Sequence, residues 1–324
     1  MIRALIKPLN ALSAAVSYMQ SSFTGQAVIK GMPVSVSIEL TNSCNLNCPE
    51  CLSGSGKMTR GKGFIDPDLF GKIIAELKPY LYYLTLYFQG EPMLHPHFFS
   101  LLRKSKRIRT SVSTNGHFLS EENAAKIAQS GLNRLIVSLD GMDQSTYSAY
   151  RVKGDFAKVM EGIRNIANAR KKNHSSLRLE IQFLVNRYNE HQIPEARKFA
   201  RRMHASLKLK SMQITDKNDF EEWLPSLERF RRYKKINNEY VIKSSFPDGC
   251  ARLWFNPVIT WDGKVLPCCF DKDGGYVMGD LNEDSFRDIW NGPKYRSFRK
   301  SILSARWMTD ICRNCTSGLN RVIC

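Results

Sequence analysis

Apolar and polar residues alternate with two different periods along most of the chain. Extended apolar runs predict strands, whereas apolar positions three and four residues apart predict helices that bury one face. The predicted strands are Val34–Thr41, Leu81–Phe88, Arg109–Ser113, Arg134–Leu139, Leu177–Val185 and Leu207–Ile214. The predicted helices between them are Asp66–Lys78, His97–Lys106, Ser120–Ser130, Phe156–Arg170 and Ile193–Met203. This alternation predicts an α/β fold with a parallel sheet curled into a partial (β/α)6 barrel.

The pattern divides the chain into three predicted segments. Residues 1–32 form an amphipathic helical extension, residues 33–215 form the barrel, and residues 216–324 form a linker and a small domain. Beyond Ile214 the sequence becomes charged and aromatic, which predicts a linker with short helices. Thr260-Trp-Asp-Gly263 lies between two apolar runs and predicts a β-hairpin. Two further helices are predicted at Asp284–Trp290 and Pro293–Leu303.

The first 23 residues read as one helix with an apolar stripe. Its apolar positions, three or four residues apart, are Ile2, Leu5, Ile6, Leu9, Leu12, Val16 and Met19. Polar residues interrupt the stretch, so it is a poor signal peptide, and it is too short and too polar to span a bilayer. Two interpretations remain, a helix packed on the barrel and a helix lying on a membrane interface. We favour packing.

Cysteines supply the first chemical signal. The chain has 9 cysteines, and three of them, Cys44, Cys48 and Cys51, follow the first predicted strand at a CxxxCxxC spacing. Thiolates at these offsets can converge on one soft metal centre, and three of them leave one iron of a four-iron cluster open. The alternative is three unrelated buried cysteines. Grouped cysteines indicate metal ligation rather than disulfides, which implies a reducing compartment such as the cytoplasm.

This cysteine loop resembles that of the radical S-adenosylmethionine (radical SAM) superfamily, whose core is a TIM-like barrel. The resemblance implies that the open iron of a 4Fe-4S cluster binds S-adenosyl-L-methionine. One electron from the cluster then generates a 5′-deoxyadenosyl radical, which abstracts hydrogen from a substrate. Because an open iron is easily oxidised, an anaerobic habitat is also implied.

Turns at later strand ends resemble the family's cofactor-binding motifs. Phe88-Gln-Gly-Glu-Pro92 is similar to the Gly-Gly-Glu-Pro motif, with Gln89 in place of the first glycine, and its glutamate would hold the methionine amino group. A serine and an arginine, here Ser138 and Arg151, would bind the methionine carboxylate, and the end of the fifth strand would pass near adenine. The implied cofactor contacts are Gly90, Glu91, Ser113, Asn115, Ser138, Asp140, Arg151 and Gln182.

The later cysteines resemble those of a SPASM or twitch domain, which holds an auxiliary 4Fe-4S cluster. The implied ligands are Cys250, Cys268, Cys312 and Cys315. Cys269 and Cys324 are left over. A structural zinc site is the competing interpretation. We favour iron–sulfur because the first two ligands are far apart in sequence and the region follows a radical SAM core.

The resemblance implies a radical SAM oxidoreductase. The specific hypothesis is a dehydrogenase-like two-electron oxidation with the auxiliary cluster as electron acceptor. Such a route needs a general base; Asp216, Asp219 and Glu221 are candidates by position only, and none is assigned. Two alternatives are radical modification or epimerisation of a peptide, and modification of a lipid- or nucleotide-linked sugar. A non-enzymatic iron–sulfur sensor is a third, against which the cofactor motifs argue.

The formal charge of +18 indicates anionic partners. Candidates are a flavodoxin or ferredoxin electron donor, an anionic small-molecule, sugar or peptide substrate, and an anionic membrane surface. No nucleic-acid-binding module accompanies the basic residues, so specific nucleic-acid binding is not expected. The predicted location is the cytoplasm, with a peripheral position at the inner face of the membrane as an alternative.

Overall fold

The computed structural model describes residues 2–244 and 247–315, with the side chains of residues 2–4 excepted. Cys324, which the sequence left without a role, lies outside the described residues. The chain forms two compact units. The first unit comprises residues 1–43, 59–111 and 246–315, and the second comprises residues 44–58, 112–245 and 316–324. Each unit is described by itself.

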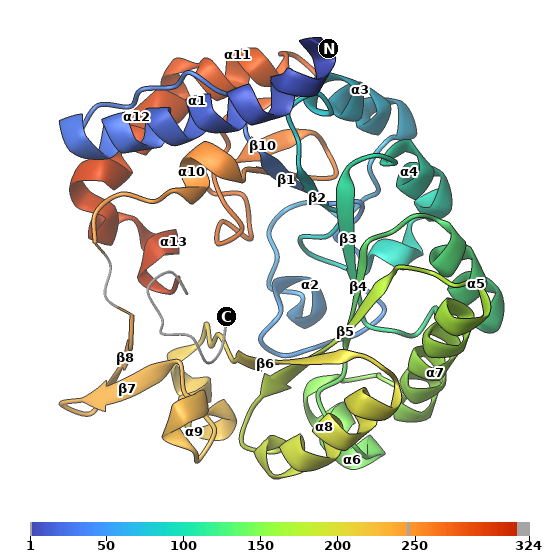
Figure 1. Cartoon of the computed structure of the whole chain (residues 1–324). Helices are drawn as coiled ribbons and strands as arrows, with labels where there is room; N and C mark the ends of the chain where they lie inside the picture. Colours follow the sequence, from blue (N-terminus) through green and yellow to red (C-terminus); the bar gives the residue numbers. More distant parts are fainter. Residues whose placement is uncertain (1, 245–246, 316–324) are drawn as a thin grey trace. The chain divides into compact units, whose positions relative to one another are not determined.

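The first unit contains the beginning of the parallel sheet and a small antiparallel extension (Figure 1). Its strand order is β11-β10-β9-β1-β2-β3. β1 pairs in parallel with both β2 and β9, and β10 is antiparallel to β9 and β11. The chain crosses into the second unit within β3. The strands are β1 (Ser35–Ile38), β2 (Tyr83–Thr85), β3 (Arg109–Thr114), β9 (Val258–Ile259), β10 (Lys264–Leu266) and β11 (Gly279–Asp280).

Helices α3 and α11 of the first unit begin at side chains that cap them. The Asp66 carboxylate accepts hydrogen bonds from the N–H groups of Asp68 and Leu69, and Pro67 takes the first helical position of α3. Ser285 caps α11 in the same way. The elements are α1 (Ile2–Thr24), α3 (Pro67–Leu77), η1 (Pro92–Leu94), α4 (Phe98–Lys104), α10 (Arg252–Phe255), α11 (Phe286–Asn291), α12 (Pro293–Ala305), η5 (Arg306–Met308) and α13 (Asp310–Arg313).

The second unit contains the parallel strands β4, β5 and β6 in that order, together with the end of β3 (Figure 1). The strands are β4 (Arg134–Ser138), β5 (Arg178–Val185), β6 (Ser206–Ser211), β7 (Tyr233–Ile236) and β8 (Glu239–Ile242). The helices are α2 (Leu52–Ser55), α5 (Glu121–Gln129), α6 (Gln144–Tyr150), α7 (Phe156–Lys172), η2 (Glu190–Gln192), α8 (Ile193–Arg202), η3 (Lys217–Asp219), α9 (Phe220–Trp223) and η4 (Glu228–Phe230).

The sequence of elements confirms the predicted α/β fold class, a partial (β/α)6 barrel followed by a small domain with a hairpin. Several elements were not predicted, α6 and the β7–β8 pair among them. Helix α6 follows β4, and β7 and β8 form an antiparallel hairpin where we predicted only a linker with short helices. Asn237 and Asn238 make that turn with positive φ angles of 47° and 64°, which asparagine tolerates better than most residues. Among the described helices, none is long and apolar enough to cross a membrane.

Candidate metal and cofactor centre

The three cysteines of the CxxxCxxC loop lie together in the second unit. Cys48 is buried, whereas Cys44 and Cys51 are half-buried, and all three belong to or pack against one apolar cluster. The N–H of Cys51 donates to the Cys48 carbonyl over 3.2 Å, and α2 begins directly afterwards. Gly54 allows α2 to approach the loop, because a Cβ there would lie 2.6 Å from the Cys48 nitrogen.

Donor groups point at two of these sulfur atoms. Arg151 Nη1 lies 3.7 Å from Cys48 Sγ, and the backbone N–H of Leu46 lies 3.5 Å from Cys44 Sγ. Burial raises the pKa of the Cys48 thiol to about 11, and the neighbouring Arg151 acts in the opposite direction. A bound metal would deprotonate such a thiol. A sulfur that accepts N–H groups is suited to a metal-bound thiolate, and the loop fits a three-cysteine cluster.

Arg151 and the buried Asp140 form an ion pair beside this loop. Arg151 Nε lies 2.5 Å from Asp140 Oδ2, and the other carboxylate oxygen accepts the N–H of Leu184 over 2.6 Å. Both oxygens of Asp140 are thus engaged within the protein. With both oxygens bound in this way, the Asp140 carboxylate positions the Arg151 guanidinium.

His117 belongs to this centre and was missed by the sequence reasoning. Its Nε2 accepts the N–H of Asp155 over 2.9 Å, so Nδ1 carries the proton and donates to Asn115 Oδ1 over 3.0 Å. Asn115 Nδ2 in turn donates to Asn45 over 2.7 Å and lies 3.9 Å from Cys44 Sγ. The histidine therefore fixes the orientation of an amide that contacts the cysteine loop. The Asn115-Gly-His117 sequence was its only signal.

Glu50, between the second and third cysteines, was also missed. Its carboxylate is buried and accepts both the N–H and the hydroxyl of Thr215 over 2.7 Å. Burial raises the pKa of Glu50. Thr215 follows the C-terminal end of β6, so these hydrogen bonds connect the cysteine loop to that end of the strand.

The remaining predicted cofactor contacts occupy strand ends. Ser138 and Gln182 are register neighbours on β4 and β5, and Ser113 lies near the end of β3. Gly90 and Glu91 belong to the first unit, where the Glu91 N–H donates to the Ser43 carbonyl over 2.8 Å. Gly90 has a φ of +73°, and a Cβ there would lie 2.6 Å from the Thr41 carbonyl oxygen. Only glycine allows this turn to pass so close to the residues that lead into the cysteine loop.

The linker carboxylates that are candidates for a general base have different hydrogen-bond and ion-pair partners. The Asp216 carboxylate accepts the N–H of Asn218 and faces Lys57 over 3.8 Å. Glu221 is exposed and accepts the hydroxyl of Tyr240 over 2.6 Å. None of these contacts distinguishes a general base, and we assign none.

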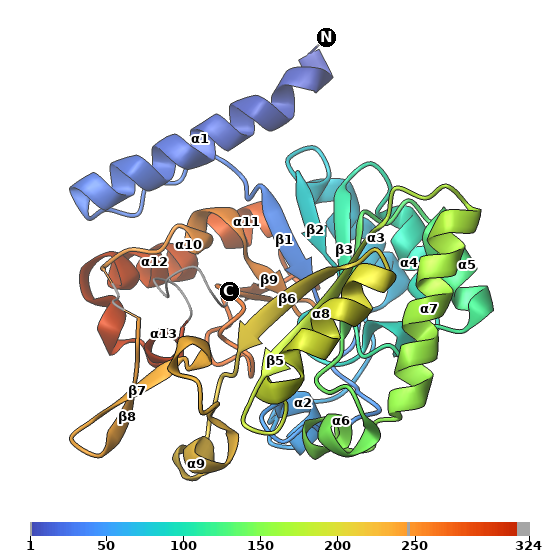
Figure 2. The ribbon, with the colours of Figure 1, turned by 60° about the horizontal axis from the view of Figure 1, so that its bottom comes forward.

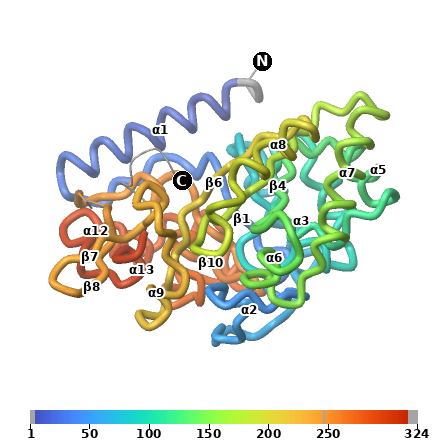
Figure 3. The backbone as a smooth tube through the Cα atoms, turned by 90° about the horizontal axis from the view of Figure 1, so that it is seen from below, coloured from blue at the N-terminus to red at the C-terminus, as the bar shows by residue number. Residues whose placement is uncertain are grey.

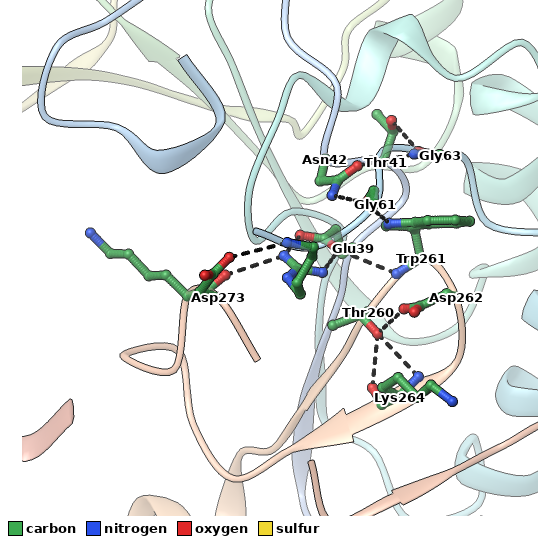
Figure 4. A network of polar contacts seen from close by, with 12 residues as sticks. Glu39, Thr41, Asn42, Gly61, Gly63, Thr260, Trp261, Asp262, Lys264 and Asp273 are labelled. Atoms are coloured by element: carbon green, nitrogen blue, oxygen red, sulfur yellow. Dashed lines mark hydrogen bonds and ion pairs between the residues drawn. The ribbon is translucent and has the colours of Figure 1, made fainter. Parts of the chain in front are cut away.

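A polar network in the first unit anchors both ends of the cysteine loop (Figure 4). Arg60 makes a bidentate ion pair with buried Glu39, with both N–O distances at 2.9 Å. Asp273 accepts the N–H and the hydroxyl of Thr59 over 2.9 and 2.6 Å. The Trp261 indole N–H donates to the Gly61 carbonyl over 3.1 Å. The strand before the loop, the segment after it and the β9–β10 hairpin are thereby joined.

The four later cysteines line one cavity of the first unit. Apolar and basic side chains complete its wall, and the lining residues are Cys250, Arg252, Leu253, Cys268, Phe270, Phe298, Ile302, Arg306, Ile311, Cys312 and Cys315. Burial raises the pKa of Cys268 and of Cys312. Four sulfurs around one mostly apolar cavity match the donor set of a cubane iron–sulfur cluster.

Two arginines contact sulfurs at this cavity. Arg306 is buried, and its guanidinium donates to the Gly249 carbonyl over 3.1 Å and lies 3.7 Å from Cys315 Sγ. Arg252 Nη1 lies 3.5 Å from the sulfur of Cys269, the cysteine that the sequence left over. Within the described residues, no group of three or more His, Cys, Asp or Glu side chains is arranged to hold a single metal ion.

Comparison with known proteins identifies the class. Residues 38–200 match the model of the radical SAM superfamily, and residues 250–316 match the iron–sulfur cluster-binding SPASM domain. The chain belongs to the radical SAM superfamily and carries a C-terminal SPASM domain. These domains imply a 4Fe-4S cluster that binds S-adenosylmethionine and an auxiliary cluster, as the sequence predicted.

Relatives within the class carry out different reactions. The chain is 31% identical to the mycofactocin maturase MftC of Mycobacterium ulcerans over 83% of this chain and 77% of the relative. It is 22% identical to an S-adenosyl-L-methionine-dependent 2-deoxy-scyllo-inosamine dehydrogenase of Niallia circulans over 87% of this chain and 92% of the relative. Among solved structures, Streptococcus suis SuiB bound to S-adenosylmethionine superposes with a TM-score of 0.64 at 16% identity, covering 96% of this chain and 78% of SuiB.

Proposed function

We propose that this radical SAM enzyme removes two electrons from its substrate, with the auxiliary cluster as the electron acceptor. The observation that carries the proposal is the cavity lined by Cys250, Cys268, Cys312 and Cys315, with buried Arg306 in its wall. Reduction adds negative charge to a cluster, and nearby positive charge and N–H···S contacts favour that step. The cavity has the composition expected of an electron-accepting site.

The first cluster would be held by Cys44, Cys48 and Cys51. When bound with S-adenosylmethionine it supplies a radical that abstracts a hydrogen atom from the substrate. Arg151 donates to Cys48 and is itself held by Asp140, while His117 and Asn115 fix the other side of the loop. These residues would keep the loop in one geometry.

The cofactor contacts are proposed on the turns that resemble the family's motifs. Glu91 would bind the methionine amino group, and Ser138 and Arg151 its carboxylate. Because both oxygens of Asp140 bind groups of the protein, we assign it the role of positioning Arg151. The remaining proposed contacts are Gly90, Ser113, Asn115 and Gln182.

An alcohol is the simplest substrate for this chemistry. Oxidation of an alcohol carbon to a carbonyl removes one electron with the abstracted hydrogen atom, one proton from the hydroxyl group and one electron to the auxiliary cluster. The similarity to a dehydrogenase supports this substrate class.

Peptide modification is the second candidate function. It is supported by the identity of 31% to a mycofactocin maturase over 83% of the chain. Both candidates need an external reductant for the first cluster. The charge of +18 favours a negatively charged electron donor such as flavodoxin or ferredoxin. The predicted cellular location is the cytoplasm.

Iron content and cofactor cleavage test the proposal. After anaerobic reconstitution, wild type should hold about 8 iron atoms, and both a Cys44/Cys48/Cys51→Ala and a Cys312/Cys315→Ala variant about 4. Only the first variant should lose 5′-deoxyadenosine formation. Cys269→Ala is the matched control and should retain about 8.

Substrate assays then separate the candidates. The first probe is 2-deoxy-scyllo-inosamine, followed by other polyols and by peptides, each scored by its stimulation of 5′-deoxyadenosine formation. Stimulation by an alcohol, with carbonyl product that disappears in Cys312/Cys315→Ala, supports the oxidation. A wild-type protein with only about 4 iron atoms, all lost in the triple variant, would rule out the auxiliary acceptor.

A further inference from the structure

Helix α1 has an apolar face that its own unit leaves uncovered. Six large apolar side chains on this face are exposed, from 36% for Val16 to 96% for Phe23. We call them the outer stripe, and they are Leu5, Leu9, Leu12, Val16, Met19 and Phe23. Their spacing of four, three, four, three and four residues places them along one line of the helix. In Figures 2 and 3, α1 lies along the outside of its unit.

The opposite face of α1 is attached to the protein by small and polar residues. Asn10 exchanges two hydrogen bonds with the backbone of Met32, at 2.9 and 2.8 Å. The hydroxyls of Ser17 and Ser21 accept the backbone N–H groups of Lys30 and Val28 over 2.8 and 2.9 Å. The helix is therefore oriented with its polar side inward, the reverse of an ordinary surface helix.

The segment that receives α1 is itself fixed. The indole N–H groups of Trp254 and Trp290 donate to the carbonyls of Val28 and Gly31, both over 2.9 Å. The Tyr18 ring also packs on Trp254, with the ring centroids 5.3 Å apart. Since these contacts hold the polar face in place, rotation of α1 to bury the outer stripe would break them.

The charge composition of the N-terminal segment indicates what covers the stripe. The first 38 residues contain Arg3, Lys7 and Lys30 but no aspartate or glutamate. If the stripe is read as the a and d positions of a coiled coil, the flanking e and g positions are Ile6, Pro8, Ser13, Ala15, Gln20 and Ser22. These residues supply none of the charge pairs that specify a helical partner. A basic, acid-free helix with one apolar face matches an anionic lipid surface instead.

We propose that the outer stripe of α1 binds the interface of an anionic lipid bilayer, with the helix axis parallel to the surface. Apolar side chains of the stripe enter the boundary between headgroups and acyl chains, and the net charge of +18 attracts the protein to acidic headgroups. The protein would then work at the membrane surface, whatever substrate it oxidises or modifies.

Vesicle sedimentation of the full-length, cluster-loaded protein tests the proposal under anaerobic conditions. The vesicles are phosphatidylcholine alone and phosphatidylcholine mixed with phosphatidylglycerol. Wild type should sediment with the mixed vesicles, and added salt should weaken this binding because it screens the charges. Leu9/Leu12/Met19→Ser should lower the partition coefficient more than about tenfold, whereas Leu227/Ile236→Ser, which alters exposed apolar residues of the second unit, should leave it unchanged.

Three results would overturn the proposal. Wild type could fail to sediment with the mixed vesicles, or the outer-stripe variant could sediment as well as wild type. Light scattering could instead find a dimer that the outer-stripe variant converts to monomer, which would make the stripe a contact between two copies. Iron content and thermal melting confirm that each variant is folded and loaded.

Discussion

Arg306 is a basic residue in the wall of the auxiliary cavity. Its guanidinium is buried and lies 3.7 Å from Cys315 Sγ. An N–H···S contact and a positive charge both stabilise the reduced cluster more than the oxidised one. Arg306→Gln should therefore shift the reduction potential of the auxiliary cluster to a more negative value, on the order of 60 mV for a lost contact of about 1.5 kcal/mol.

A redox titration followed by electron paramagnetic resonance measures this shift. The Cys44/Cys48/Cys51→Ala background leaves only the auxiliary cluster to be titrated. Arg306→Lys retains the charge and should shift the potential less. An unchanged potential in Arg306→Gln would show that the arginine serves packing alone.

Gly63 and Gly61 form a matched pair beside Trp261. A Cβ on Gly63 would lie 2.3 Å from the Trp261 ring, whereas a Cβ on Gly61 would lie 4.0 Å from it. Gly63→Ala must displace the indole and should lower the free energy of unfolding by about 1–3 kcal/mol. Gly61→Ala should change it by less than about 0.5 kcal/mol. Denaturation followed by tryptophan fluorescence compares the two, and equal losses would contradict the packing argument.

The short helix η1 ends at a buried histidine, His95, whose neutral tautomer is fixed by its contacts. His95 Nδ1 accepts the N–H of His97 over 3.0 Å, so the Nε2 proton is donated to the Ile65 carbonyl over 2.8 Å. Burial lowers the pKa of His95, while the bond to Ile65 opposes this shift. The folded protein thus binds this proton less readily than the unfolded chain, whose histidines titrate near about 6.5.

Stability should therefore fall in acid. His95 makes its full contribution to the free energy of unfolding above about pH 6.5. This contribution is lost as the pH falls from there through the lowered pKa of His95 in the folded protein. In His95→Gln, which keeps a donor and an acceptor but does not titrate, the melting temperature should fall less between neutral and mildly acidic pH. Identical pH profiles for the two proteins would show that another group controls the acid response.

Elements with regular burial could be predicted from the sequence. Strands such as β5, with residues buried at most positions, are apolar runs, and Asp66 with Pro67 marks the start of α3. The β7–β8 hairpin escaped prediction because its strands are short and only Tyr233 among their residues is buried. Its charged and aromatic residues therefore resemble those of a linker.

Some residues of the candidate site could likewise be predicted from the sequence, and others could not. The CxxxCxxC cysteines and the Cys312/Cys315 pair could be found because their ligand spacing is local in sequence, whereas Cys250 and Cys268 were implied by the family resemblance. His117, Glu50 and Arg306 could not, because each acts through a contact with a residue distant in the chain. Such contacts depend on how the strands and loops come together, which a single sequence does not record.

At the scale of the whole molecule, the compact units differ from the family domains. The first unit contains part of the segment matched by the radical SAM model and most of the segment matched by the SPASM model. The ion pair between Glu39 and Arg60 and the contact of Trp261 with Gly61 lie within it. The SPASM hairpin therefore shares its packing with β1, and the predicted boundary at residue 215 remains a prediction about sequence domains.

Loss of the auxiliary cluster should consequently loosen the first unit selectively. Cys250 and Cys312 pack against a core of Leu253, Trp254 and Ile302, and Tyr18 of α1 packs against the same core. Emptying the cavity in Cys312/Cys315→Ser removes the group that fills the space beside this core. Hydrogen exchange should accelerate by roughly tenfold, equivalent to about 1.4 kcal/mol, in α10, α12 and α1.

Hydrogen exchange measured by mass spectrometry separates local from global effects. Helix α7 of the second unit should keep its protection in Cys312/Cys315→Ser, and Cys269→Ser should leave both units as in wild type. Equal acceleration in α7 would mean that the two units unfold as one. Unchanged exchange in α1 would mean that the contact between Tyr18 and Trp254 does not couple the helix to the auxiliary cavity. The expected pattern would instead link the state of the auxiliary cluster to the helix that carries the outer stripe.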